Sequence, residues 1–432
     1  MGLFSQRIAL IDTENAFKIG PQIKFLEDQG KKVIKCNLGE PDFPVPQHIK
    51  DEVKRQIDLD NTHYCDPQGI LPLRKAIAKH LSESRRIEAT AERVVVFPGA
   101  KPPIGFCQQT YCDPGDEVVY PSPAFPIYES FIPYVGAKPV PVHLMEDKNF
   151  SLSGADLAPF LTKKTKLIFL NFPSNPTGGV ASKEQLQEIA DVIKKQCSES
   201  TRIFSDEVYE DILFDGHEHH SIISCPGMEK KTILVSGASK SYSWTGGRIG
   251  WALFPSSEEA EIFKNLNINY FSCTAPYNQE GVRFGLESPL SRGSIQKMVK
   301  TFQERRDLVV NGLNTIKGIR CQTPKGAFYV FPNISGVCEN LGALDAYRGL
   351  PSKVQKMTSP STLFQMFLLF EHQVATLDRK SFGRIGIEDL HFLRLSIATD
   401  TESLKEGVKR IAAAAQDSQG FKAFVKKGEH LY

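Results

Sequence analysis

The chain lacks both a charge imbalance and a long apolar run. Its 432 residues include 52 Lys and Arg against 50 Asp and Glu, a formal net charge of +2. This balance gives no electrostatic basis for binding nucleic acid or an anionic membrane surface, so we expect neither partner. No stretch of about eighteen apolar residues is present, which argues against a membrane span. The opening segment, MGLFSQRIAL, lacks the pattern of a signal peptide and, with Gln6, that of myristoylation.

The sequence also lacks paired cysteines, repeats and low-complexity tracts. Its nine cysteines are odd in number and scattered, with no CxxC pair, which argues against a disulfide framework or a zinc finger. We therefore expect a reducing compartment, the cytoplasm, and interpret Cys107 and Cys112 as core thiols. The three histidines of GHEHH (216–220) are too close together in an evident loop to form a tetrahedral site, so no metal is expected.

Short apolar runs alternate with amphipathic helical patterns through the middle of the chain. Continuous apolar runs of four to eight residues are typical of strands covered on both faces. Their alternation with helices predicts a mostly parallel sheet flanked by helices. The expected strands are RVVVF (93–97), DEVVY (116–120), KLIFLNF (166–172), RIFSDE (202–207), TILVS (232–236) and RIGWALF (248–254).

The last third has a different pattern. A long amphipathic helix (298–316) precedes an expected strand (327–332), a less regular stretch (335–361), a further strand (391–399) and a closing helix (403–416). We expect an α/β fold in which residues 48–295 form a large ligand-binding domain. The N-terminal arm, residues 1–47, and the C-terminal part, residues 296–432, form a smaller α+β domain.

Small, polar and aromatic residues follow the predicted strands. Ligands of open parallel sheets bind just beyond the carboxyl ends of the strands, so these residues should meet at one edge. They are Gly99, Ala100, Lys101, Phe125, Asn175, Asp206, Tyr209, Ser239 and Lys240. The edge therefore combines a helix start, an aromatic ring, an amide, a carboxylate, a phenol and a lysine.

One ligand meets all these demands. The PGAKPP segment opens a helix, whose free amides favour phosphate, and Ser239 and Arg248 can add a hydroxyl and a guanidinium. Phe125 can stack on a flat ring, and Asp206 can pair with a protonated ring nitrogen. A lysine that loses its proton is a Schiff-base nucleophile. The pattern indicates pyridoxal 5′-phosphate, with Lys240 bonded to its aldehyde.

Five segments carry a resemblance to a known family. SGASKSYSWTGGRIGW resembles the lysine signature of class I aminotransferases, the fold type I pyridoxal-phosphate enzymes. NLGEPDF, NFPSNPTGG, SDEVYE and HFLRLSIAT are similar to other family segments in the same order. The resemblance runs from about residue 5 to residue 415. It implies a transaminase that moves an amino group from an L-amino acid to a 2-oxo acid.

The resemblance implies roles for individual residues at the cofactor. Lys240 forms the Schiff base and moves the proton between substrate and cofactor, and Asp206 keeps the pyridine nitrogen protonated. Asn175 and Tyr209 hydrogen-bond the ring oxygen, and Phe125 stacks on the ring. The residues placed around the phosphate are Gly99, Ala100, Lys101, Ser239 and Arg248.

The resemblance also implies substrate contacts and an assembly. Arg394 matches the arginine that grips the α-carboxylate, with Gly39 beside it and Asn175 nearby. Tyr64 matches a tyrosine that reaches the phosphate of a neighbouring subunit, which implies a homodimer with shared active sites.

Some features depart from the family pattern. Gly237 stands where many relatives have a phosphate-binding serine, and no second basic group for a distal carboxylate is evident. Gln108 and Gln109 lie where one subgroup has a lysine, and the stretch 339–362 is long. The amino donor is left open among aspartate, aromatic, alanine and broader types.

Two alternatives share these motifs. A carbon–sulfur β-lyase or an aminocyclopropane-carboxylate synthase would use the same cofactor for a different reaction. A non-enzymatic regulator of this fold usually carries a DNA-binding domain, for which there is no room before Pro41.

Overall fold

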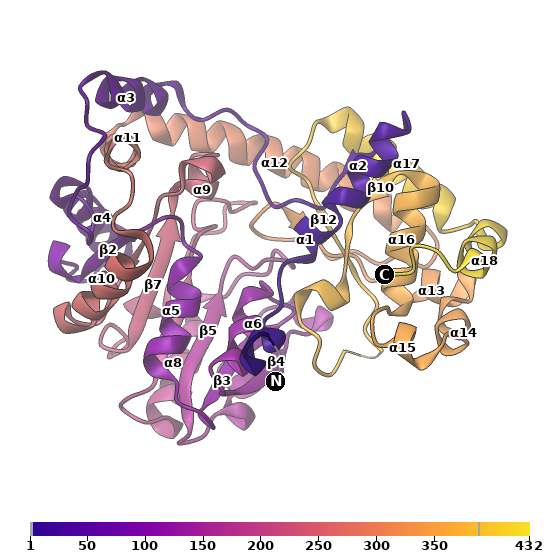
Figure 1. Ribbon diagram of the computed structural model, residues 1–432, viewed down its shortest axis with the longest axis horizontal. Coiled ribbons are helices and arrows are strands. Elements are labelled where there is room, and N and C mark those ends of the chain that lie inside the picture. Colours follow the sequence, from indigo (N-terminus) through magenta and orange to yellow (C-terminus); the bar gives the residue numbers. More distant parts are fainter. Residues whose placement is uncertain (1–2, 388) are drawn as a thin grey trace.

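A seven-stranded sheet forms the centre of the molecule (Figure 1). The computed structural model describes residues 3–387 and 389–432. The strands lie in the order β2-β8-β7-β6-β5-β3-β4. Their bounds are β2 Val94–Phe97, β3 Glu117–Ser122, β4 Lys138–His143, β5 Thr165–Asn171, β6 Arg202–Asp206, β7 Thr232–Gly237 and β8 Gly250–Leu253.

The sheet is mostly parallel, which confirms the predicted fold class. Strands β7, β6, β5, β3 and β4 pair in parallel, whereas β8 is antiparallel to both β2 and β7. The carboxyl ends of all strands except β8 therefore share one edge. Strand β8 begins at that edge, which is why Arg248, two residues before it, lies beside residues that follow the other strands.

Both faces of the sheet are buried, as the continuous apolar runs predict. Along β2, Val95 and Phe97 belong to one core cluster, whereas Val94 and Val96 belong to another. The first face is covered by α5 (Pro102–Tyr111), α6 (Ile127–Tyr134) and α10 (Ser257–Phe271). The second is covered by α3 (Gln47–Asp58), α4 (Leu71–Arg85) and α8 (Lys183–Gln196).

Local signals explain where α8 begins. Ser182 caps α8 by accepting from the backbone amide of Gln185, and the Gln185 side chain accepts from the Ser182 amide. This reciprocal capping box satisfies two amides that a helix start leaves free. Apolar residues at 186, 189, 190 and 193 then bury one face of the helix against the sheet.

Edge strand β4 was not among the predicted strands. Its sequence, KPVPVH, contains Pro139 and Pro141. Proline cannot donate to a sheet ladder, so a run with two prolines does not read as a strand. β4 pairs only with β3, so it is an edge strand. Its outer side has no partner strand, and prolines are tolerated there because no ladder hydrogen bond is lost.

The C-terminal part packs around a second, smaller set of strands. β9 (Tyr329–Val330), β11 (Leu377–Asp378) and β12 (Leu393–Ser396) form an antiparallel sheet in the order β11-β12-β9. The helices around them are α12 (Leu290–Asn314), α13 (Ser335–Leu341), α14 (Ala343–Arg348), α15 (Ser352–Gln355), α16 (Pro360–His372), α17 (Thr401–Ala414) and α18 (Ser418–Lys427). Most side chains of α16 are buried, so this helix is the core of the region.

The stretch expected to be less regular is a series of short helices. α13, α14 and α15 occupy it, broken by Gly342 at φ +72° and by Pro351. Each helix is too short for a clear apolar period, which is why the pattern is not visible in the sequence.

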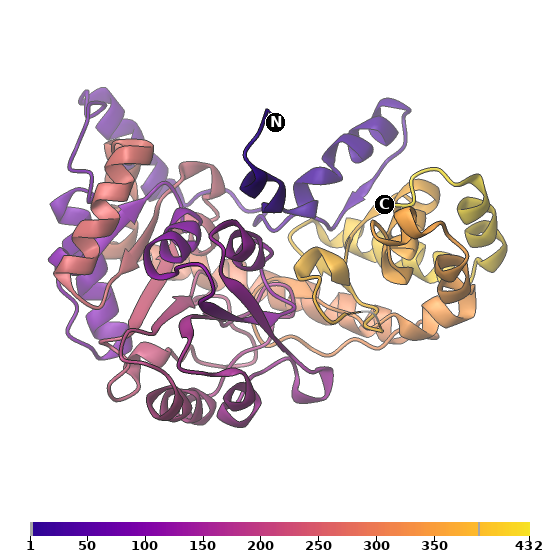
Figure 2. The ribbon, with the colours of Figure 1, turned by 60° about the horizontal axis from the view of Figure 1, so that its bottom comes forward.

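The N-terminal arm joins both parts of the molecule. Its strand β1 (Ile34–Lys35) pairs in parallel with β10 (Val374–Ala375) of the C-terminal part. Before it, the arm contains η1 (Gln6–Leu10), α1 (Asn15–Lys18) and α2 (Gly20–Asp28). Figure 2 shows this indigo segment lying across the junction of the sheet-bearing part and the yellow C-terminal part.

The remaining helical segments are short or connect these elements. They are α7 (Gly154–Leu157), α9 (Ala238–Ser241), α11 (Pro276–Glu287), η2 (Ala91–Arg93), η3 (Glu146–Lys148), η4 (Ala158–Phe160), η5 (Ile222–Ser224), η6 (Thr245–Gly247) and η7 (Arg379–Phe382). None of the helices within 3–387 and 389–432 is long and apolar enough to cross a membrane.

Candidate active site

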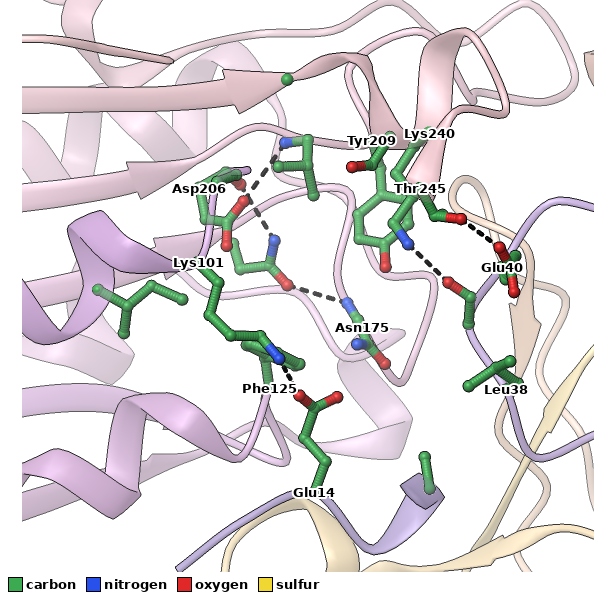
Figure 3. Close-up of a pocket in the computed structure, with 18 of the residues that line it drawn as sticks. Glu14, Leu38, Glu40, Lys101, Phe125, Asn175, Asp206, Tyr209, Lys240 and Thr245 are labelled. Carbon is green, nitrogen blue, oxygen red and sulfur yellow. Dashed lines mark hydrogen bonds and ion pairs between the residues drawn. The ribbon is translucent and has the colours of Figure 1, made fainter. Parts of the chain in front are cut away.

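A cavity of about 480 Å³ lies at the sheet edge where the strands end (Figure 3). Its wall comes from the sheet-bearing part, the N-terminal arm and the C-terminal part. The predicted residues that line it are Gly39, Ala100, Lys101, Phe125, Asn175, Asp206, Tyr209, Ser239, Lys240, Arg248 and Arg394. The structure therefore brings together residues that are up to 355 positions apart in the sequence.

Lys240 lies in the single turn α9 that follows β7. Its Nζ donates a hydrogen bond to the Gly39 carbonyl oxygen at 2.6 Å. Burial, together with the Arg394 and Arg248 cations, lowers the pKa of Lys240 to about 8, against the opposing effect of the Glu14 and Glu40 carboxylates. A larger fraction of neutral amine, the nucleophilic form, is therefore present near neutral pH than for an exposed lysine.

Asp206 is the last residue of β6 and its carboxylate is buried. Tyr128 donates to its Oδ2 at 2.6 Å, and Asn171 donates to its backbone carbonyl at 3.0 Å. Burial raises the pKa of Asp206 from 3.8 to about 6, although the Tyr128 hydrogen bond favours the ionised form. A cation placed against this carboxylate would remove the cost of its burial.

The neighbour of Asp206 points to the opposite face of the strand. Glu207 accepts from Arg85 and from Ser221, and His219 lies 2.8 Å from the same carboxylate. Successive strand residues alternate in direction, so one carboxylate of SDEVYE enters the cavity and the next holds the fold together. His219 of GHEHH is thus a partner of Glu207, and no cluster that could hold a metal occurs among residues 3–387 and 389–432.

Arg394 and two phenols line the deep wall of the cavity. Arg394 is 3% exposed, and it donates to the Asn37 carbonyl and, at 3.2 Å, to Asn175 Oδ1. Its Nε is buried without a hydrogen-bond partner. Tyr209 and Tyr329 share a hydrogen bond of 2.8 Å between their hydroxyls, and the Arg394 guanidinium lies over the Tyr329 ring at 4.6 Å. The guanidinium is therefore held rigidly and has donors left for an anion.

The opposite end of the cavity is suited to a phosphate. Gly99 has φ +94°, and a Cβ there would lie 2.1 Å from Nη2 of Arg248. Only glycine therefore lets the guanidinium approach this backbone. Arg248 donates to the carbonyls of Thr245 and Pro98, and Ser239 lines the cavity close by. α5 begins three residues after Gly99.

Two predicted residues, Gly99 and Tyr64, are not part of the cavity wall. Gly99 lies against Arg248, which lines the cavity, whereas the Tyr64 side chain is 88% exposed. Gln108 is turned inward and donates to the Tyr128 carbonyl, whereas Gln109 bonds within its own helix. All nine cysteines are free thiols, and Cys107 and Cys112 are buried.

Sequence reasoning missed several cavity residues, among them four with ionisable side chains. Tyr128, Tyr329, Glu14 and Glu40 line the wall but follow no predicted strand end. Tyr128 lies in α6, one turn below Phe125, and could have been found from that spacing. Glu14 and Glu40 come from the arm, whose path across the cavity carries no sequence signal.

Comparison with known proteins decides the family. Residues 31–411 match the family model described as aminotransferase class I and II. The chain belongs to the class I and II aminotransferases. The resemblance expected from the five motifs is thereby confirmed.

Individual relatives of this aminotransferase agree with that assignment. It is 34% identical over 390 residues to an aspartate aminotransferase of Pyrococcus abyssi, covering 90% of this chain and 93% of the relative. It is 32% identical over 390 residues to aromatic-amino-acid aminotransferase 2 of Thermococcus litoralis, with 90% and 92% covered. The crystal structure of the aspartate aminotransferase of Rhizobium meliloti gives a TM-score of 0.83 at 30% identity, covering 96% of this chain and 99% of that chain.

The aminotransferase is thus a transaminase that uses pyridoxal phosphate. The cavity fits this cofactor on three observations. Asp206 is a buried carboxylate with no ion pair to a described residue, the Arg248 guanidinium lies against the Gly99 backbone just before the start of α5, and Lys240 has a lowered pKa. These three groups match a protonated ring nitrogen, a phosphate and an aldehyde.

Proposed function

We propose that Lys240, Asp206 and Arg394 carry the transamination, with roles set by their positions in the cavity. Bound pyridoxal phosphate supplies an aldehyde that condenses with an amine and a ring that accepts electrons from the substrate Cα. The remaining chemistry belongs to side chains of the chain itself.

Lys240 holds and moves the proton. Its lowered pKa supports a neutral amine that can bond to the aldehyde and, once released by the substrate, act as a general base at Cα. The hydrogen bond to Gly39 keeps Nζ in the cavity, below the arm. In this contact an N–H of Lys240 points at the Gly39 carbonyl, so the lone pair of the neutral nitrogen points away from the arm.

Asp206 and its partners hold the far side of the ring. The buried carboxylate supports a proton on the ring nitrogen, and Tyr128 fixes which oxygen faces that nitrogen. Tyr209 and Asn175 are proposed to bind the ring oxygen, and Phe125 to stack on the ring. Gly99, Ala100, Lys101, Ser239 and Arg248 are proposed around the phosphate, the first three largely through backbone amides.

Arg394 is proposed to bind the substrate α-carboxylate. The buried Nε without a partner is the observation that supports this role, because an unsatisfied guanidinium donor is costly until an anion completes it. Gly39 and Asn175 flank the same position. The side chain of the substrate then extends toward the arm.

The named relatives do not decide between two classes of amino donor. They include aspartate aminotransferases and an aromatic-amino-acid aminotransferase at similar identity. The donor class therefore has to come from the residues of this cavity.

The experiment is a half-reaction. Mixing the holoenzyme with each of a panel of amino acids should shift its absorbance to that of the amine form, and a 2-oxo acid should reverse the shift. Pyruvate and ammonia released without any oxo-acid acceptor would instead show a lyase. A holoenzyme that gives no spectral change with any amino acid would contradict transamination.

Three further assignments are part of this proposal. The division into an arm (1–47), a large domain (48–295) and a C-terminal part (296–432) is supported by the joining of β1 to β10. A homodimer is supported by the exposure of Tyr64, which leaves it free to reach a neighbouring subunit. The cytoplasm is supported by nine free thiols.

A further inference from the structure

The mouth of the cavity is formed by the N-terminal arm, where the side chain of the substrate must lie. With the α-carboxylate on Arg394, the groups that remain toward the arm are Glu14, Phe17, Leu38, Glu40 and Lys101. We call these five residues the arm subsite. None of them was assigned a side-chain-reading role by the sequence.

The only cation of the arm subsite is already paired. Lys101 Nζ forms an ion pair with Glu14, whose side chain is 15% exposed, and lies 5.5 Å from the Phe125 ring centroid. Figure 3 shows the Lys101 side chain reaching along the cavity to Glu14. A substrate carboxylate that approaches this lysine meets a charge already balanced by Glu14 and is repelled by the Glu14 carboxylate.

The other cations of the cavity are assigned to other tasks. Among the described residues that line it, the remaining ones are Lys240, Arg248 and Arg394. Lys240 serves the aldehyde, and Arg248 is held by two backbone carbonyls at the phosphate end. Arg394 serves the α-carboxylate. Within one chain, the described residues that line the cavity therefore include no cation that is free for a second substrate carboxylate.

The second acidic group of the arm subsite adds to this exclusion. The Thr245 hydroxyl donates to Glu40, which keeps that carboxylate at the mouth. Two carboxylates and one lysine leave the arm subsite with an excess negative charge. Like charges at this range repel an acidic side chain.

Apolar side chains provide the contact surface of the arm subsite. Phe17 is 62% exposed and Leu38 is 37% exposed, and both also line an adjoining cavity of about 500 Å³. A substrate side chain that covers them removes apolar surface from water, which stabilises the complex. The adjoining cavity gives a long or aromatic side chain space beyond the mouth, and the two lysines in its lining, Lys24 and Lys35, are each in an ion pair with an acidic residue.

We propose that the arm subsite selects substrates with an uncharged, apolar side chain and rejects those with a second carboxylate. This inference rests on the proposed function. It applies to both half-reactions, so the amino donor and the 2-oxo acid acceptor are monocarboxylic. Aliphatic or aromatic amino acids and their oxo acids fit; aspartate, glutamate and 2-oxoglutarate do not.

Binding of two matched acids to the holoenzyme tests the arm subsite without turnover. 3-Phenylpropionate and succinate share one carboxylate and two methylenes, and differ in ending with a phenyl ring or a second carboxylate. Calorimetry should give a dissociation constant at least about tenfold lower for 3-phenylpropionate. Equal or tighter binding of succinate, or no binding of 3-phenylpropionate, overturns the proposal.

A substitution of Glu14 tests whether its ion pair with Lys101 causes the rejection of a second carboxylate. Glu14→Gln frees Lys101, so succinate should bind at least about tenfold tighter than to the wild type while 3-phenylpropionate changes little. Adding Lys101→Met should abolish this gain. Glu117→Gln is the matched control, because Glu117 forms a similarly buried ion pair with Lys138 at the opposite ends of their strands. A Glu14→Gln variant that behaves like this control overturns the proposal.

Turnover separates the subsite from the proposed function. The wild-type enzyme should show a higher kcat/KM for phenylalanine or leucine than for aspartate or lysine. A higher value for the acidic or the basic donor overturns the arm subsite but leaves transamination intact. If no donor gives a half-reaction, transamination is overturned. The dissociation constants of 3-phenylpropionate and succinate then still test the arm subsite.

Discussion

At the scale of single residues, burial moves two pKa values of the cavity in opposite directions. It lowers that of the Lys240 amine to about 8 and raises that of the Asp206 carboxyl to about 6. Each group is thereby destabilised in its charged form, and each would be relieved by bonding to the cofactor. The same burial thus gives an amine ready to react and a carboxylate ready for a cation.

Replacement of Lys240 should remove both its bonding and its proton transfer. We expect Lys240→Ala to lower the rate of the half-reaction by at least about 10³-fold, the upper part of the range for a general base. Stopped-flow absorbance with a saturating donor measures it. Lys166→Ala serves as the control, since Lys166 pairs with Ser200 outside the cavity. A rate within tenfold of the wild type would remove Lys240 from the chemistry.

The Asp206 carboxylate should destabilise the cofactor-free protein. Its folded pKa is about 6 against 3.8, so its ionisation costs little below pH 4 and the full amount above pH 6. Asp206→Asn should therefore raise the free energy of unfolding of the cofactor-free protein at pH 8 by up to about 3 kcal/mol. The gain should disappear near pH 4. Urea unfolding at both pH values measures it; a loss of stability at pH 8 contradicts the assignment.

At the scale of elements, the loop between β2 and α5 prepares the phosphate site. Gly99→Ala puts a Cβ against Arg248 at a φ of +94°. We expect at least about tenfold weaker binding of pyridoxal phosphate, measured by absorbance titration. Gly115→Ala is the matched control: its φ is +92°, but its Cβ would meet nothing within 4 Å. Backbone strain is common to both variants, so equal affinities would show that the close approach to Arg248 is not needed.

Strands and their ends were predictable, because buried parallel strands leave continuous apolar runs. The runs at 93–97, 166–172 and 232–236 each overlap an observed strand to within one residue at either end, and residues that follow them line the cavity. The reversed direction of β8 was not predictable, since its run looks the same in either direction. Strand β4 was hidden by its prolines, and Glu14 and Glu40 enter the site by a path of the arm that only tertiary contacts determine.

At the scale of the whole molecule, the proposed homodimer makes each active site depend on two chains. Tyr64 is exposed in one chain and should complete the site of the other. Mixing Tyr64→Ala and Lys240→Ala subunits would then create hybrids in which one site has both an intact Tyr64 and an intact Lys240.

Such hybrids give a quantitative expectation. Random reassembly of equal amounts should recover about one quarter of the wild-type activity at limiting cofactor, because half of the dimers have one intact site of two. Each variant alone should stay far below this value. The control omits the dissociation step, so that no hybrids form. A mixture no more active than the sum of its components would show that Tyr64 does not act across subunits.

The account as a whole depends on one covalent bond between the chain and its cofactor. Reducing the holoenzyme with borohydride makes that bond permanent, and mass analysis of the peptides then locates it. We predict one pyridoxyl group per chain, on the peptide that contains Lys240. A label on another lysine, or no label on a holoenzyme that retains its cofactor, would contradict the account.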